Sequence, residues 1–251
     1  MTSSTSEMKQ WMKTLNLTEA AHILEESLLD AQAKDWSCGR FLQHLLRYEL
    51  QKRDEKQRAK RMKWAAFPFI KSLDDFRLEE QQSLSKRQME QLRGLLWLEH
   101  TYNIILLGPP GTGKTHLSIG LGIEALEKGR RVSFVAMDTL VHLLKTQGIA
   151  RTSQVRMRRI LDSDLVIIDD LMFMAMDKSE SNLFFQFVNK LYGQVSIILT
   201  SNKGPEEWGE LLGDPVITTA ILDRILHKSE VIKLSGDSFR LKHRETIFGD
   251  F

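Results

Sequence analysis

Residues 108–115 read Gly-Pro-Pro-Gly-Thr-Gly-Lys-Thr, with the apolar run 104–107 directly before them and a helical pattern, 116–127, directly after them. They match G-x-x-x-x-G-K-[ST] at every fixed position, which is typical of a phosphate-binding P-loop between a buried strand and a helix. The glycines let backbone N–H groups turn toward phosphate oxygens, and the helix begins with its positive dipole end there. We therefore expect a nucleotide site, with Lys114 on the β- and γ-phosphates and Thr115 on Mg²⁺, formed by Gly108, Pro109, Pro110, Gly111, Thr112, Gly113, Lys114 and Thr115.

Length and composition set the frame for this site. The 251 residues are 42% apolar and 27% charged, enough for one full core and a small accessory domain. The single cysteine, Cys38, excludes an internal disulfide and fits a reducing compartment. No apolar run approaches the length of a membrane span, and the first residues lack the pattern of a secretory signal. We therefore expect a cytoplasmic protein without a membrane partner.

The first part of the chain predicts a small all-helical domain, residues 1–68. Aliphatic side chains recur there at helical spacing, and a turn is expected between two helices, with Ser37 as the N-cap of the second. That helix should run to about Lys63 and end before Pro68, because the residue before a proline disfavours the helical conformation. Another helix, about 85–100, should lead into the rest of the second domain, 69–251.

From Asn103 on, short apolar runs alternate with amphipathic helical stretches. Strands are expected at 103–107, 131–136, 164–169, 195–200 and 230–234. This alternation is typical of a parallel sheet with helices on both faces. The chain is therefore predicted to have an α/β fold with a parallel five-stranded sheet, preceded by the helical domain.

Two acidic residues, Asp169 and Asp170, end the predicted strand 164–169. An apolar strand that ends in an acidic pair and follows a P-loop resembles a Walker B element. We expect Asp169 to hold Mg²⁺, directly or through a water, and Asp170 to polarise the attacking water as a general base. A buried strand that ends in Asp is also common at ordinary turns. The functional interpretation of this pair therefore depends mainly on the P-loop.

A third polar group, Thr200-Ser201-Asn202, follows another apolar run. In a doubly wound sheet this strand end lies at the ligand crevice beside the P-loop. Asn202 is expected to hydrogen-bond the γ-phosphate or the attacking water; the alternative is an asparagine that opens a turn. His116 is expected to be only an early residue of the helix after Thr115. Packing or partner contact is expected for Met172, Met174 and Met176.

Two basic runs predict contact with double-stranded DNA. The run 47–63 has eight Lys or Arg against three acids, and 145–159 has five against none. Such side chains bind phosphates without reading the base sequence, whereas the alternative is a solvated helix face. The expected contacts are Lys52, Lys56 and Lys60 at i, i+4 spacing in the first run, and Lys145, Arg151, Arg156, Arg158 and Arg159 in the second.

With these motifs the chain resembles the IstB-type ATP-binding proteins, the helper ATPases encoded beside the transposase of certain bacterial insertion sequences. The resemblance covers nearly the whole chain. It is carried by Phe41-Leu42, Glu49-Leu50, Arg53, Phe67-Pro68, Asn103, GPPGTGKTH at 108–116, Thr200-Ser201-Asn202, Trp208-Gly209, Gly213-Asp214-Pro215, Ala220–His227 and Ser238-Phe239-Arg240. This family belongs to the AAA+ ATPases and is similar to DnaC-type helicase loaders.

The resemblance implies an AAA+ P-loop NTPase that uses ATP and Mg²⁺. It also implies a homo-oligomer with ATP at its subunit interfaces, which assembles on DNA at the bacterial nucleoid and recruits or activates its cognate transposase. Carried over to this sequence, Asn202 is sensor 1, Arg224 is an arginine finger and Arg240 is a sensor 2 candidate. The ordinary alternative for Arg224 is a surface arginine paired with Asp223.

The sequence departs from the family pattern at two places. Where the family commonly has Asp-Glu-Leu-Gly, this chain has Asp169-Asp170-Leu171-Met172, and Phe239 stands where Tyr is usual. Asp is one methylene shorter than Glu, and a misplacement of about 1 Å can cost on the order of 100-fold in rate. We therefore expect either slow hydrolysis or a base that acts through a second water. Only a strand, 231–234, and one helix, 237–248, are expected near the C-terminus, which implies a reduced C-terminal lid.

Two other functions stay open on the sequence alone. One is a DnaC-like replicative helicase loader, which uses a nearly identical core, although the segment 41–68 resembles the transposition helper. The other is an ATP-gated DNA scaffold with little hydrolysis, a function that the short Asp170 side chain would suit.

Overall fold

The computed structural model describes residues 2–81, 83–171, 176–211 and 213–242. The chain divides into two compact units, Met1–Lys60 and Arg61–Phe251, which are described separately. Over the described ranges, the structure has no helix with the length and apolar character needed to cross a membrane.

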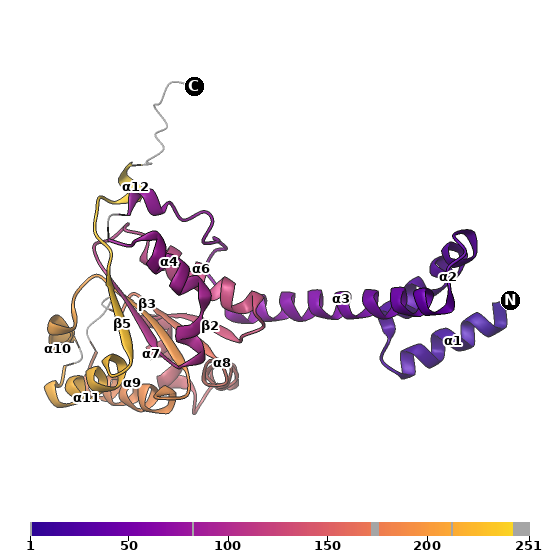
Figure 1. Ribbon diagram of the computed structural model, residues 1–251. Coiled ribbons are helices and arrows are strands. Elements are labelled where there is room, and N and C mark those ends of the chain that lie inside the picture. Colours follow the sequence, from indigo (N-terminus) through magenta and orange to yellow (C-terminus); the bar gives the residue numbers. More distant parts are fainter. Residues whose placement is uncertain (1, 82, 172–175, 212, 243–251) are drawn as a thin grey trace, which may run out of the picture. The chain divides into compact units, whose positions relative to one another are not determined.

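The first unit contains α1 (Thr2–Thr14), α2 (Thr18–Ala33) and most of α3 (Cys38–Ala65) (Figure 1). Its small core is formed by Ala20 and Leu24 of α2 and Leu45 of α3. The backbone N–H of Arg40 donates to the Ser37 hydroxyl at 3.3 Å, as expected for an N-cap, and α3 ends before Pro68 as predicted.

A buried carboxylate ties α2 to α3 within this unit. The backbone N–H of Ala20 donates to Glu49 at 2.8 Å, and Arg53 Nε donates to the same carboxylate at 2.8 Å. Arg53 also donates to the Asn16 carbonyl. Glu49 and Arg53, two of the residues that carry the family resemblance, therefore stabilise the helical unit.

The second unit is built on a five-stranded parallel sheet with strand order β2-β3-β4-β1-β5. Each strand lies within one residue of its expected position, which confirms the predicted α/β fold. The strands are β1 (Asn103–Leu107), β2 (Val132–Ala136), β3 (Leu165–Asp169), β4 (Ser196–Ser201) and β5 (Ser229–Lys233).

The sheet is buried on both faces because successive side chains of a strand point to opposite sides. In β3, Val166 and Ile168 pack into one cluster with side chains of α7–α9 and α11, whereas Leu165 and Ile167 pack into another with α4 and α6. The helices of the two layers are α4 (Lys86–Gly94), α6 (Lys114–Glu127), α7 (Met137–Thr146), α8 (Arg151–Leu161), α9 (Lys178–Leu191) and α11 (Pro215–Leu226).

The remaining elements are short. They are η1 (Leu78–Glu80), α5 (Leu96–Glu99), η2 (Pro205–Glu207), α10 (Trp208–Leu211) and α12 (Phe239–Lys242). The prediction of a single helix over 85–100 is wrong. Two helices, α4 and α5, occur there, and they are separated by Leu95, which has a left-handed φ of 62° and a side chain buried in the core. Of the helix expected over 237–248, the part beyond Lys242 lies outside the described residues.

Candidate functional site

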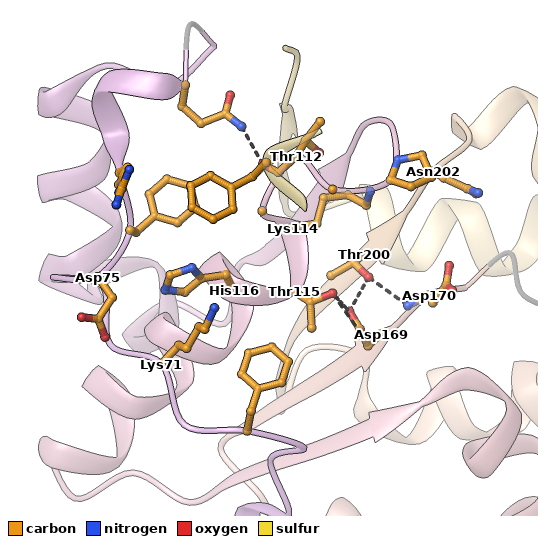
Figure 2. Close-up of a pocket in the computed structure, with 18 of the residues that line it drawn as sticks. Lys71, Asp75, Thr112, Lys114, Thr115, His116, Asp169, Asp170, Thr200 and Asn202 are labelled. Carbon is orange, nitrogen blue, oxygen red and sulfur yellow. Dashed lines mark hydrogen bonds between the residues drawn. The ribbon is translucent and has the colours of Figure 1, made fainter. Parts of the chain in front are cut away.

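The strand order brings three chain segments to one edge of the sheet. Because β4 lies between β3 and β1, the ends of these strands meet beside the P-loop. A cavity of about 470 Å³ opens there (Figure 2). It is lined by residues of 110–115, by Asp169, Asp170, Thr200 and Asn202, by residues between 69 and 81, and by residues between 237 and 242.

The P-loop backbone has positive φ angles at its three glycines, namely 149° at Gly108, 84° at Gly111 and 92° at Gly113. A Cβ atom at Gly108 would collide with the carbonyl oxygen of Leu234, and one at Gly111 with the Ser238 side chain. These positions therefore require glycine for both their conformation and their close contacts.

The ammonium of Lys114 lies beside the loop. Its Nζ donates to the carbonyl oxygens of Gly108 at 2.6 Å and Pro109 at 2.9 Å. Lys114 also lines the cavity, so its charge is available to an anion that the loop would hold.

A chain of hydrogen bonds links α6, β3 and β4 at the base of the cavity (Figure 2). Thr115 Oγ1 donates to Asp169 Oδ1 at 3.0 Å, and Thr200 Oγ1 donates to the same oxygen at 2.7 Å. Thr200 Oγ1 in turn accepts the backbone N–H of Asp170 at 2.9 Å. The Thr200 hydroxyl thus fixes both acidic residues relative to the P-loop.

Burial raises the pKa of the Asp169 carboxyl above its usual value, and the neighbouring Asp170 adds to this rise. The hydroxyls of Thr200 and Thr115 and the charge of Lys114 oppose it. A carboxylate in this environment gains from a nearby cation. The oxygen donors of Thr115 and Asp169 are also the kind that Mg²⁺ prefers, so the residues present fit this ion.

Asp170 has a left-handed backbone, with φ of 58°, and its side chain is exposed at the cavity. Aspartate and asparagine tolerate this conformation better than most residues. Asn202 lines the same cavity and is also exposed. The structure therefore brings together the P-loop, both acidic residues and Asn202, as the motifs predict.

One wall of the cavity is formed by residues that were not identified as site residues from the sequence motifs. Gln81 Nε2 donates to the Thr112 carbonyl at 2.6 Å. The His116 ring bonds to the Ser72 carbonyl at 2.9 Å and contacts Phe76 edge to face, with ring centroids 5.3 Å apart. His116 is an early residue of α6, as expected, and its ring also lies on this wall (Figure 2).

A family model described as IstB-like ATP binding protein matches residues 10–247. The chain belongs to this IstB-like family. A Pseudomonas aeruginosa relative, "Insertion sequence IS21 putative ATP-binding protein", is 36% identical over 238 residues, which cover 95% of this chain and 90% of the relative. An "Insertion sequence IS21-like putative ATP-binding protein" of Bacteroides fragilis is 33% identical over 244 residues, 97% of this chain and 93% of the relative.

Solved structures match the fold of the IstB-like chain. DnaI has a TM-score of 0.54 at 16% identity, over 66% of this chain and 89% of that one. AMPPCP-bound DnaA from Aquifex aeolicus has a TM-score of 0.51 at 24% identity, over 66% of this chain and 50% of that one. The IstB-like chain thus has an AAA+ fold, as expected, and belongs to an ATP-binding family.

The other candidates of the IstB-like chain are Arg224, Arg240 and three methionines. Arg224 lines a separate cavity of about 180 Å³, and its partners are Asn189 and the Ala220 carbonyl, each at 2.9 Å, rather than Asp223. Arg240 belongs to α12, but its side chain lies outside the described ones, as do Met172 and Met174. Met176 is buried in the core.

The basic residues that were predicted to contact DNA differ in their ion pairs and in their exposure. Lys52 pairs with Glu55 at 2.8 Å, Lys56 pairs with Glu19, and Lys145 pairs with Glu180 at 2.8 Å. Lys60 lies farther along α3. The side chains of α8 form a more open basic surface, because its buried face is made by Ser153, Met157 and Ile160 and its arginines are exposed: Arg151, Arg156, Arg158 and Arg159.

Proposed function

We propose that this IstB-like chain is an ATPase that assembles on double-stranded DNA and recruits or activates the transposase of an insertion sequence. ATP would lie at the interfaces of a homo-oligomer, with residues 1–68 as a domain for DNA or partner contact. Thr115 and Asp169 would hold Mg²⁺, which supplies charge neutralisation at the phosphates. Relatives named for insertion sequences support the transposition role.

The observation that carries the proposal is the hydrogen-bond chain from Thr115 through Asp169 and Thr200 to Asp170. It holds the oxygens of Thr115 and Asp169, a pair that suits a metal ion, and the backbone of Asp170 in place beside the P-loop. Phosphoryl transfer depends mainly on such positioning and on charge stabilisation. Asn202, on the same cavity, would orient the γ-phosphate or the attacking water.

The test of the whole proposal is assembly on duplex DNA, followed by electron microscopy with ATP, with ADP and without nucleotide. ATP-dependent particles that capture the cognate transposase are expected. Particles that bind a replicative helicase instead would favour the helicase-loader alternative, and particles that form equally without ATP would refute nucleotide-gated assembly.

We predict that Asp170→Asn lowers ATP turnover at least tenfold while ATP affinity stays unchanged. Asparagine keeps the left-handed backbone but cannot accept a proton, so the loss concerns the chemical step rather than ground-state binding. Single-turnover hydrolysis and equilibrium binding of ATP separate the two quantities. Equal hydrolysis rates for the variant and the wild type would show that Asp170 is no base, and the ATP-gated scaffold would then be the better description.

We predict that changing Arg156, Arg158 and Arg159 together to Gln weakens binding to all duplex sequences about equally. The log–log dependence of affinity on salt should flatten by roughly 0.9 for each phosphate that the variant no longer neutralises. The matched variant changes Lys52, Lys56 and Lys60 to Gln, and a smaller effect is expected there because Lys52 and Lys56 each pair with a glutamate. An unchanged slope in the arginine variant would remove α8 from the DNA interface.

A further inference from the structure

A large aromatic side chain lies exposed beside the basic surface of α8. Trp64, near the end of α3, is 44% exposed, and the guanidinium carbon of Arg159 lies 5.2 Å from the centre of its ring. Both residues belong to the second unit. The contact therefore joins the C-terminal end of α3 to α8, two segments that lie far apart in the sequence.

The neighbouring arginines of α8 provide a comparison. Arg158 is also exposed, but its partner is Asp162 at 3.9 Å, one turn along the chain. Arg159 instead lies over the indole of Trp64. This contact keeps the charge of the guanidinium and does not use its N–H groups as hydrogen-bond donors. No acidic residue occurs between Lys145 and Leu161, so the local charge is complementary to a polyanion.

A guanidinium that is already held against a ring loses less conformational entropy when it binds a phosphate. A free arginine side chain loses rotamer freedom when it is fixed on a ligand, typically about 0.5–1.5 kcal/mol for a flexible side chain. A side chain that is already stacked loses less of that freedom. Arg159 is therefore prepared for phosphate contact in a way that Arg158 is not.

We propose that Trp64 is a positioning residue for DNA binding, which holds Arg159 against a backbone phosphate of duplex DNA. The inference rests on the proposed contact between α8 and DNA, and it adds the end of α3 to that surface. The partner is the phosphate backbone, because a stacked guanidinium offers donors and charge without reading a base edge.

The test is a double-mutant cycle on the full-length chain, measured by fluorescence anisotropy of a labelled duplex in the presence of ATP. Trp64→Leu should weaken DNA binding about two- to tenfold, because Arg159 is then ordered only when it binds the phosphate. Arg159→Gln should weaken it more and flatten the salt dependence by roughly 0.9 in slope. In the Arg159→Gln background, Trp64→Leu should have a much smaller effect on DNA binding, because the contact between the ring and the guanidinium is already lost.

The matched control replaces Arg158 in the same cycle. Trp64→Leu combined with Arg158→Gln should weaken binding by the product of the two separate factors. Trp64→Phe keeps an aromatic ring and should retain most of the DNA affinity. This variant controls for an affinity loss in Trp64→Leu that comes from poor packing. Thermal unfolding and ATP affinity should match the wild type for each variant used.

Two outcomes would overturn the inference and separate it from the proposed function. If Trp64→Leu weakens binding equally with and without Arg159, or not at all, the positioning role is wrong while α8 can still bind DNA. If the Arg156, Arg158 and Arg159 triple variant keeps the wild-type salt slope, the DNA role of α8 fails, and the inference fails with it.

Discussion

Replacing Lys114 with alanine is expected to lower ATP affinity by roughly 30- to 4,000-fold and to abolish ATP-dependent assembly on DNA. The ammonium donates to the Gly108 and Pro109 carbonyls and would be the main counter-charge for the β- and γ-phosphates. Removing one partner of such a hydrogen-bonded charge pair costs about 2–5 kcal/mol, which corresponds to that range of affinities. Equilibrium binding of a fluorescent ATP analogue measures the loss.

Lys128, at the other end of α6, provides the matched control. Its Nζ also donates to two backbone carbonyls, Gly94 at 3.0 Å and Arg93 at 3.3 Å. Lys128→Ala therefore removes the same charge and the same type of contact, but outside the cavity. ATP affinity should stay near that of the wild type. An unchanged affinity in Lys114→Ala, or equal losses in both variants, would contradict the role given to the P-loop lysine.

Arg224→Ala is expected to bind ATP but to lose on the order of 10³–10⁵ in turnover, the contribution of an arginine finger in other systems. Arg224 is not among the residues that line the P-loop cavity of its own chain, and it lies on a second cavity with His227 and Lys228. A role at the γ-phosphate therefore requires the nucleotide of a neighbouring subunit.

Mixing two inactive variants tests whether Arg224 acts at the nucleotide of a neighbouring subunit. An Arg224→Ala protein combined with a Lys114→Ala protein should regain activity, because some interfaces then pair an intact P-loop with an intact arginine. If mixed assemblies form and turnover never returns, the role in trans is wrong. Asn189→Ala removes the hydrogen bond of Arg224 to α9, and it keeps both the charge of Arg224 and its contact with the Phe185 ring. If this variant lost as much turnover as Arg224→Ala, Arg224 would be mainly structural.

The sequence predicted the parts of the fold that depend on local pattern. Apolar runs gave all five strands to within one residue, and the P-loop motif gave the glycines with positive φ angles. The break at Leu95 was missed because α4 and α5 share one amphipathic pattern. A left-handed leucine is held by its burial in the tertiary structure, which no local propensity records.

The contacts that complete the site depend on the order of strands, which periodicity does not encode. Thr200 bridges Asp169 and Asp170 because β4 lies between β3 and β1, although the motif directed attention to Asn202. Gln81 and Phe76 reach the cavity from an irregular stretch without a motif. Likewise, the spacing of Lys52 and Lys56 predicted a basic helix face, but the pairing of Lys56 with Glu19 depends on the packing of α2 against α3.

The strand order also has a consequence for how the protein is made on the ribosome. Within the described sheet the P-loop strand β1 pairs with β4 and β5, and β4 is translated about 90 residues after it. At about 5–20 residues per second, β1 waits roughly 5–20 s for its first neighbour. The N-terminal helices, whose core is formed within the first 60 residues, are complete long before. A nascent chain therefore carries a finished helical unit well before it can bind ATP, and premature termination before Ser201 leaves the apolar edge of β1 exposed to aggregation.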